Sequence, residues 1–166
     1  MKNNEQIIRG LFSLFRLDQK ALCEEAMASL KAYRKVCEEV DHRQKEKKEI
    51  LGVDSDQNLD AAVVAWESFS REKEKAEFNR ELGGYYESHK LVKSIDKAIE
   101  GVKHYPKMGE RYYVILSSRY INLIEKDDEQ IADELGISRS QYFQQRKEAT
   151  LLFAFVLGIK EKTKQK

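Results

Sequence analysis

The hydrophobic residues of this chain recur at the three- and four-residue spacing of amphipathic α-helices. Residues 4–16 place apolar side chains on one face of a short helix, and residues 19–50 form a long helix that fades into a charge run at 43–49. No run of β-branched residues alternates strictly between turn residues, as a strand would. The pattern predicts an all-α protein. The long helix carries a heptad-like stripe made of Cys23, Ala26, Leu30, Tyr33, Cys37 and Val40.

A polar stretch at 52–58 predicts a turn after the long helix, followed by a second long helix over 58–81. These two helices would form an N-terminal hairpin, with the stripe either as its internal seam or as a zipper between two subunits. Gly83 and Gly84 interrupt the helical pattern, so we place a domain boundary there. Residues 1–84 are thus predicted to be a helical region for oligomerisation or partner binding.

A further amphipathic helix is predicted to end between Gly101 and His104, and Pro106 suits the start of the next helix, which spans 107–124. Residues 85–159 are predicted to form one domain, followed by a basic tail at 160–166. The apolar positions of the first of these helices are Leu91, Val92, Ile95, Ala98, Ile99 and Val102.

Residues 128–155 have the spacing of a helix-turn-helix, in which the second helix enters the DNA major groove. Ala132 is small where the second helix would cross, and Gly136 follows the first helix where a positive φ is expected. Ser138 is a favourable N-cap, and Gln141 stands where it completes a capping box. The apolar face of the first helix consists of Ile131, Ala132 and Leu135. Tight helical corners that bind no DNA use the same residue types, so both interpretations stand.

The second helix divides into two faces. Its inward side is predicted to contain Tyr142, Ala149, Phe153 and Val156. Its outward side, together with the N-cap and Gln141, offers groups that suit base edges and phosphates. These candidate DNA-binding residues are Ser138, Arg139, Ser140, Gln141, Phe143, Gln144 and Lys147.

The charge distribution supports this interpretation. The chain as a whole has a formal net charge of +1, whereas residues 138–166 contain seven Lys or Arg and two Glu. The first helix of the motif is acidic, and Asp127 and Asp128 at its start complement the helix dipole. The lysines of the tail would add nonspecific attraction to phosphates or serve solubility alone.

Residues 151–157 read LLFAFVL and are apolar on every side of a helix. Either the N-terminal helices or a second subunit must cover them. A single helix-turn-helix contacts about half a turn of DNA, and specific sites commonly contain two half-sites. We therefore expect a homodimer whose interface uses either this apolar run or the stripe at 23–40.

Composition excludes several classes of protein. The mean hydropathy is −0.68, and the longest apolar runs are too short to cross a membrane. No secretory signal is visible, so we expect a cytoplasmic protein that does not bind membranes. The two cysteines are fourteen residues apart on one helix, too far to bridge within the chain. The scattered histidines predict no metal site, and no cofactor is expected. The absence of a phosphate-binding loop, a nucleophile elbow or an HExxH string argues against an enzyme.

The segment YPKMGERYYVILSSRYI, followed by DDEQIADELGISRS, resembles region 4 of bacterial sigma factors. The ending SRSQYFQQRKEATLLFAFVLGI is similar to the ArpU-like family of phage and prophage transcriptional regulators. The resemblance covers residues 88–159. Tyr105 and Gln145 depart from it, the latter where an apolar residue is common. The sigma-like positions are Pro106, Arg111, Val114, Ile115, Arg119 and Tyr120.

The resemblance implies control of phage late or lytic genes in the cytoplasm of a bacterial host. It implies binding of double-stranded DNA, or action as a sigma-like subunit that touches RNA polymerase, with Arg111 and Arg119 on phosphates. The alternative is a helical adaptor that acts through protein contacts with RNA polymerase or a packaging component. A steep dependence of DNA affinity on salt would distinguish the regulator from the adaptor.

Overall fold

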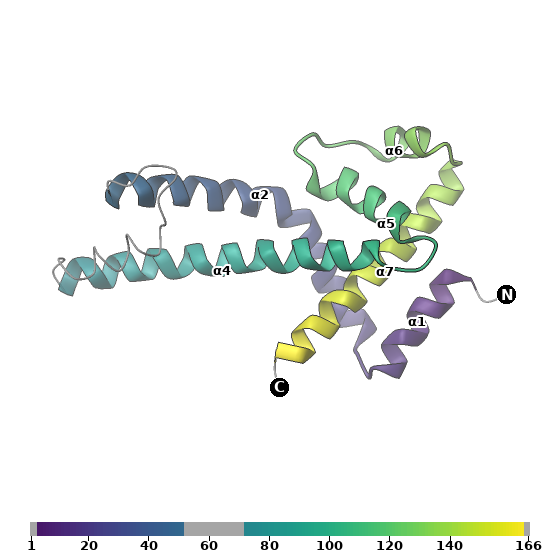
Figure 1. Ribbon diagram of the computed structural model, residues 1–166, viewed down its shortest axis with the longest axis horizontal. Helices are drawn as coiled ribbons and strands as arrows, with labels where there is room; N and C mark the ends of the chain where they lie inside the picture. The colour runs from purple at the N-terminus through teal and green to yellow at the C-terminus, as the bar shows by residue number, and fades with distance from the viewer. Residues whose placement is uncertain (1–2, 52–71, 165–166) are drawn as a thin grey trace. The chain divides into compact units, whose positions relative to one another are not determined.

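A computed structural model describes residues 3–51 and 72–164 (Figure 1). Over these ranges the chain is helical and has no strand, so the predicted all-α class is confirmed. By their contacts the residues group into two compact units, one formed by 1–34 with 93–166 and the other by 35–92. The helices are α1 (Asn4–Leu14), α2 (Gln19–Leu51), α4 (Glu72–Lys103), α5 (Gly109–Leu116), the π-helix η1 (Ser117–Ile121), α6 (Asp128–Leu135) and α7 (Arg139–Lys164).

Helix α1 is a short amphipathic helix that packs on α7. The side chain of Asn3 accepts a hydrogen bond from the backbone N–H of Gln6 and caps its start. Ile8 and Phe12 are fully buried, and the Phe12 ring meets the Phe155 ring edge to face, with 5.6 Å between centroids. Burial of two large apolar side chains anchors α1 to the C-terminal part of the chain.

Helix α2 extends from Gln19 to Leu51, close to the predicted range of 19–50. The Asp18 carboxylate accepts a hydrogen bond from the Ala21 N–H at 3.1 Å and caps the helix. Four members of the predicted stripe are buried within this single chain: Ala26, Leu30, Tyr33 and Val40. These four residues are therefore not available as an exposed zipper.

The predicted helix break at Gly83 and Gly84 is wrong, because α4 passes through both residues without interruption. Two glycines cost a helix about 2 kcal/mol relative to alanine, and neighbouring strong helix formers offset such a penalty. A Cβ on Gly84 would lie 2.7 Å from the Arg43 guanidinium of α2, so glycine permits a close approach there. The predicted turn at 52–58 and the start of the second hairpin helix lie outside the described residues.

The contact-based units also differ from the predicted division after residue 84. Residues 1–34 belong with the C-terminal part of the chain, because α1 packs on α7. Sequence periodicity identifies each helix but does not show which helix it packs against. The N-terminal residues therefore help to build the unit that contains the candidate site.

The segment between α4 and α6 differs in detail from the predicted helix over 107–124. Helix α5 begins three residues after Pro106, since Lys107 adopts a left-handed φ of 67°. A Cβ on Gly109 would overlap the Lys103 carbonyl oxygen, so the glycine lets α5 start directly against the end of α4. Helix α5 then widens into η1 at Ser117 and ends at Ile121.

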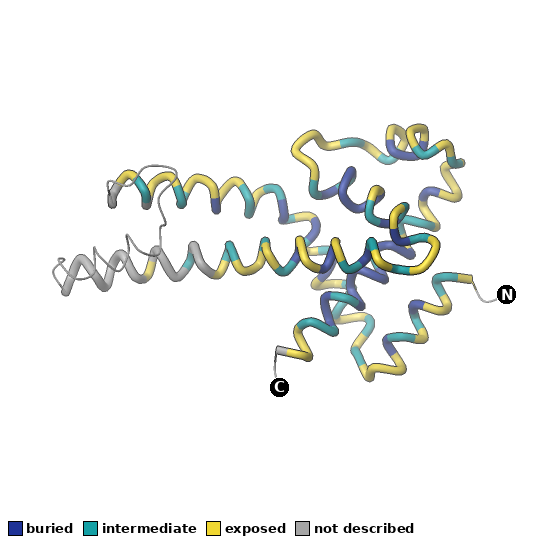
Figure 2. Tube along the Cα trace, viewed as in Figure 1, coloured by how far each residue is buried: buried dark blue, intermediate teal, exposed yellow. Residues whose placement is uncertain are grey.

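Most of the core lies around the second half of α7 (Figure 2). Residues 151–155 are all buried, and Leu157 is 5% exposed. A Cβ on Gly158 would lie 2.5 Å from Leu22 of α2, and one on Gly101 would lie 2.8 Å from Val156, so α2 and α4 approach α7 closely here. Helices of the same chain therefore cover the apolar run.

Because the chain itself covers the apolar run at 151–157, this run no longer indicates a second subunit. The predicted separate basic tail at 160–166 is also corrected in part, because α7 continues as a helix to Lys164. Lys162 donates a hydrogen bond to the Phe15 carbonyl at 2.9 Å, which holds this last part of α7 near the end of α1.

Candidate nucleic-acid interface

Helices α6 and α7 are joined by a short turn with two defined local structures. Gly136 has a φ of 65° and ends α6, as predicted for the residue after the first helix. The Ser138 hydroxyl accepts a hydrogen bond from the Gln141 N–H at 3.2 Å, and the Gln141 side chain accepts one from the Ser138 N–H at 3.0 Å. The predicted capping box is therefore confirmed, and it fixes the start of α7.

A second capping box, at the start of α6, was missed by the sequence analysis. Asp127 accepts a hydrogen bond from the Gln130 N–H, and the Gln130 side chain accepts one from the Asp127 N–H, both at 2.9 Å. The signal was present as an acidic residue followed three positions later by Gln. Both helices thus have ordered N-termini.

The two helices pack on a small apolar cluster, which also includes a residue of α5. The members predicted from the sequence, Ile131, Ala132 and Tyr142, are at most 5% exposed, and Ile115 of α5 is fully buried among them. Leu135 and Ile137 pack against the rim of the cluster. The inward faces of α6 and α7 are therefore as expected, and α5 supports the pair.

All seven candidate residues at the start of α7 are exposed. We call these residues the α7 face: Ser138, Arg139, Ser140, Gln141, Phe143, Gln144 and Lys147. The Phe143 ring is 37% exposed, with the guanidinium carbons of Arg139 and Arg146 at 5.6 and 5.2 Å from its centroid. Stacking on the ring restricts the Arg139 side chain near the surface.

The α7 face is not purely basic, because Glu5 of α1 lies against it. Its carboxylate accepts a hydrogen bond from the Gln144 amide at 3.0 Å and pairs with the Lys147 ammonium at 2.9 Å. Arg9 makes a third contact at 2.9 Å. Hydrogen bonds from Gln144, Lys147 and Arg9 lower the pKa of Glu5 to about 2. Residues 139 positions apart cannot be paired from periodicity, and the sequence analysis missed this contact.

A buried carboxylate lies directly behind the α7 face. Glu148 is 6% exposed and accepts hydrogen bonds from the Tyr112 hydroxyl at 2.6 Å and from the Gln144 amide at 3.2 Å. The Asn4 amide donates to the same Tyr112 hydroxyl at 3.2 Å. Burial and the hydrogen bond to Glu148 raise the pKa of Tyr112. This chain of hydrogen bonds connects α1, α5 and α7 beneath the surface.

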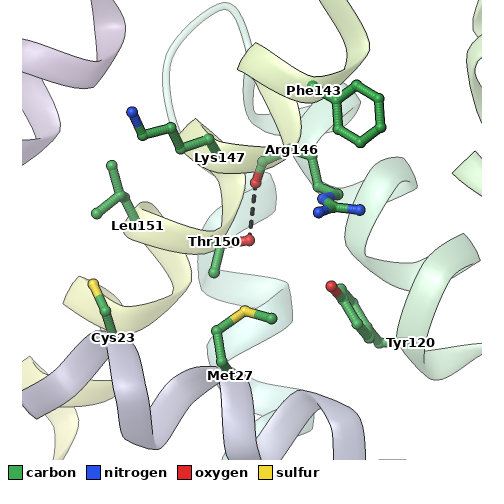
Figure 3. Close-up of a pocket in the computed structure, with 8 residues that line it drawn as sticks. All are labelled: Cys23, Met27, Tyr120, Phe143, Arg146, Lys147, Thr150 and Leu151. Carbon is green, nitrogen blue, oxygen red and sulfur yellow. Dashed lines mark hydrogen bonds between the residues drawn. The ribbon is translucent and has the colours of Figure 1, made fainter. Parts of the chain in front are cut away.

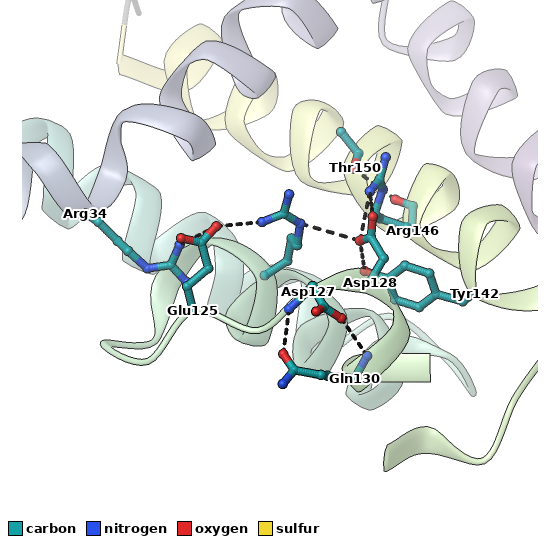
Figure 4. Close-up of polar contacts among 9 residues, drawn as sticks. Arg34, Glu125, Asp127, Asp128, Gln130, Tyr142, Arg146 and Thr150 are labelled. Atoms are coloured by element: carbon teal, nitrogen blue, oxygen red, sulfur yellow. Dashed lines mark hydrogen bonds and ion pairs between the residues drawn. The ribbon is translucent and has the colours of Figure 1, made fainter. Parts of the chain in front are cut away.

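A second polar network joins α6 to α7 around Asp128 (Figure 4). Its carboxylate accepts hydrogen bonds from the Tyr142 hydroxyl at 2.7 Å and from the Arg146 guanidinium at 2.9 and 3.0 Å. Burial alone would raise the pKa of Asp128, but these hydrogen bonds outweigh it and hold the pKa below its usual value. The network stabilises the packing of the two helices.

Arg119, a phosphate candidate by resemblance, belongs to this network rather than to the α7 face. It pairs with Glu125 at 2.8 Å and lies 3.4 Å from Asp128. Arg34 of α2 donates a hydrogen bond to the Asn122 carbonyl at 2.8 Å and lies 3.8 Å from Glu125. Arg111 is half-buried on α5, and within the ranges that the structure describes its side chain makes no hydrogen bond or ion pair. Seven of the nine candidate DNA-binding residues therefore lie together on the α7 face, and Arg111 and Arg119 lie elsewhere.

Two of the hollows along α7 border residues of the α7 face. An apolar cavity of about 410 Å³ lies between Cys23 and Met27 of α2, Leu151 of α7 and Tyr120 of η1, with Phe143 at one edge (Figure 3). A more polar groove lies between the start of α1 and the α7 face. Its lining residues are Asn3, Asn4, Met108, Ser140, Gln141, Gln144, Gln145 and Glu148.

Within the described residues, no three His, Cys, Asp or Glu side chains converge as metal ligands would. None of the described helices combines the length and apolar character that crossing a membrane requires. Comparisons with protein families, with curated proteins and with solved structures found no match to this chain. The functional argument therefore rests on the residues and their geometry.

Proposed function

We propose that this protein is a sequence-specific regulator of transcription that binds double-stranded DNA through the first turns of α7. The observation that carries this proposal is the exposed α7 face at the start of a helix whose position is fixed by Gly136 and the Ser138 capping box. A helix presented in this way matches the dimensions of the DNA major groove.

The geometry favours different roles for different members of the face. Arg139 is exposed and rests on Phe143, so its guanidinium is available for the two acceptors of a guanine. Ser140, Gln141 and Gln144 are the other candidates for base edges. Lys147 is 54% exposed and suits a phosphate. Arg119 is engaged by carboxylates, so we assign it to bracing α6 and keep only Arg111 as a second phosphate candidate.

The resemblance to ArpU-like regulators and to sigma region 4 supplies the biological setting of this proposal. It suggests control of phage or prophage genes in the cytoplasm of a bacterial host. Two half-sites on DNA would require a homodimer. Its interface would have to lie outside the apolar run at 151–157 and the buried residues of the stripe, because the chain itself covers both.

Binding to duplexes from the promoters near the gene, over a range of salt concentrations, tests the proposal. The wild type should bind one site selectively, with a log–log salt slope of several units. Arg139→Ala should lose about 1–3 kcal/mol of binding free energy at that site. Lys20→Ala, which removes an exposed charge from α2, is the control and should retain selectivity. Equal binding of wild type and Arg139→Ala to every sequence would refute the proposal.

A specific observation favours a second candidate, the helical adaptor or sigma-like subunit. Leu123 is 100% exposed and Ile124 is 77% exposed, next to each other between η1 and α6. Adjacent exposed apolar side chains are typical of protein contacts. If this candidate is correct, Leu123→Ser with Ile124→Ser should abolish binding to purified RNA polymerase or a packaging protein, whereas Arg139→Ala should leave that binding unchanged.

A further inference from the structure

Glu5 lies among the proposed DNA-binding residues although it belongs to α1 and is an acid. We propose that Glu5 is a specificity-determining residue, which restricts Gln144 to accepting hydrogen bonds from DNA and neutralises Lys147. This inference rests on the proposed function. It assigns to the N-terminal helix a direct influence on which bases are preferred and on how strongly phosphates are attracted.

The first argument concerns the hydrogen-bonding capacity of Gln144. Its amide nitrogen carries two hydrogens, and it donates to Glu5 at 3.0 Å and to Glu148 at 3.2 Å. Both partners are carboxyl oxygens that accept hydrogen bonds, so the end of the amide that faces them is the nitrogen. The Gln144 nitrogen is therefore fully used, and its oxygen is left to meet DNA.

This restriction changes the base that Gln144 suits. Bidentate recognition of adenine requires glutamine to donate to N7 and to accept from the N6 amino group. With both hydrogens engaged, Gln144 can only accept, which matches the exocyclic amino groups of cytosine or adenine and gives no contact with N7. The usual strong preference of Gln for adenine is thus weakened by Glu5.

The second argument concerns charge. The Glu5 carboxylate is 2.9 Å from the Lys147 ammonium, and the Glu5 side chain is only 16% exposed, whereas that of Lys147 is 54% exposed. A fixed negative charge at this distance reduces the attraction of Lys147 for a phosphate. Gln144, Lys147 and Arg9 together hold the pKa of Glu5 low and keep it ionised, and Arg9, the second cation, lies on α1 rather than on the α7 face.

The third argument is that Glu5 cannot simply move aside. Ile8, three residues along the same face of α1, is fully buried, and Phe12 is 1% exposed. Asn4 also bonds to the Tyr112 hydroxyl at 3.2 Å. The first turn of α1 is therefore tied to α5 and α7 at neighbouring residues, so Glu5 is a built-in part of the surface that meets DNA.

Two substitutions separate the effect of charge from the effect of hydrogen bonding. Glu5→Gln removes the charge but keeps an oxygen that accepts from Gln144, so the salt slope should steepen by about 0.9 and affinity should rise about eightfold at 0.1 M salt. Glu5→Ala also frees one hydrogen of the Gln144 amide. The preference for adenine should therefore increase at the base pair that Gln144 contacts. Glu39→Gln on α2, an exposed carboxylate, is the matched control.

Lys147→Ala, introduced into the wild type and into each Glu5 variant, tests whether the change in salt slope acts through Lys147. The steeper slope of Glu5→Gln should disappear when Lys147 is also replaced, and circular dichroism checks that each variant is folded. Suppose that the wild type binds DNA selectively, and that Glu5→Gln and Glu5→Ala both have the salt slope and the base preference of the wild type. The inference about Glu5 is then wrong, and the proposed function stands. If folded wild type and Glu5→Gln both bind no DNA selectively, the proposed function fails and the inference fails with it.

Discussion

The two halves of α7 differ sharply in their surroundings although they form one helix. Residues 139–147 are buried only at Tyr142, whereas 148–158 are buried on nearly all sides, as Figure 2 shows along the helix. The second half is enclosed by α1, α2 and α4, and the first half extends from that enclosure supported by α5 and α6. One continuous helix thereby couples a rigid anchor to an exposed surface, and substitutions in the two halves should have different consequences.

The largest difference in stability between the two halves should appear when one phenylalanine in each half is replaced by alanine. Phe153 is fully buried, and Phe153→Ala should lower the free energy of unfolding by about 3–5 kcal/mol through lost burial and a cavity. Phe143 is 37% exposed, and Phe143→Ala should cost less than about 1 kcal/mol. Urea unfolding measures both values. Equal losses for the two variants would show that the halves do not differ as described.

Smaller changes in stability, one a loss and the other a gain, are expected when two glycines are replaced by alanine. Gly136 has a φ of 65°, so Gly136→Ala should destabilise the protein by about 1–2 kcal/mol. Gly10 lies inside α1 with open space where a Cβ would be, so Gly10→Ala should stabilise it by about 0.4–1 kcal/mol. Thermal unfolding of both variants is the measurement. A stabilising Gly136→Ala would contradict the left-handed turn before α7.

Acid should weaken the contact between α1 and the exposed half of α7. The pKa of Glu5 is about 2 in the folded protein against 4.5 for the ordinary group, so the folded state favours the ionised form. This contribution to stability is complete above pH 4.5 and is lost as the pH falls toward 2. Unfolding free energies measured between pH 6 and pH 2 should fall less in Glu5→Gln than in the wild type. Parallel curves for the two proteins would mean that Glu5 makes no such contact.

Features that depend on neighbouring residues could be predicted from the sequence. The Ser138 capping box, the left-handed Gly136 and the range of α2 all follow from residues within a few positions of one another. The outward direction of the candidate residues followed from the same periodicity. Gly83 and Gly84 misled the prediction because the penalty for glycine in a helix is small enough for the rest of α4 to offset.

Features that depend on distant residues could not be predicted. The contact of Glu5 with α7 joins opposite ends of the chain, and the engagement of Arg119 by Glu125 and Asp128 requires the path of the chain after η1. Periodicity also left open whether another subunit covers residues 151–157, since an apolar run shows that it is buried but not by what. Charge assignments at the candidate site therefore needed the three-dimensional structure.

The smallest effect on stability should come from Arg139, in the exposed half. Arg139→Ala removes an exposed side chain that rests on the Phe143 ring, so the free energy of unfolding should change by no more than about 0.5 kcal/mol. Urea unfolding of the variant beside the wild type tests this value. A loss of more than 2 kcal/mol would show that Arg139 supports the fold, and its loss of DNA binding could then not be assigned to recognition.

The most direct test of the account measures how DNA affinity changes when each base pair of a bound site is replaced in turn, for the wild type and for Arg139→Ala. If the exposed half of α7 lies in the major groove, the wild type should lose about 1–3 kcal/mol at the base pair that Arg139 contacts. Arg139→Ala should lose its preference at that base pair alone and keep it elsewhere. An unchanged profile in the variant, with its fold intact, would contradict the central claim that this face reads DNA.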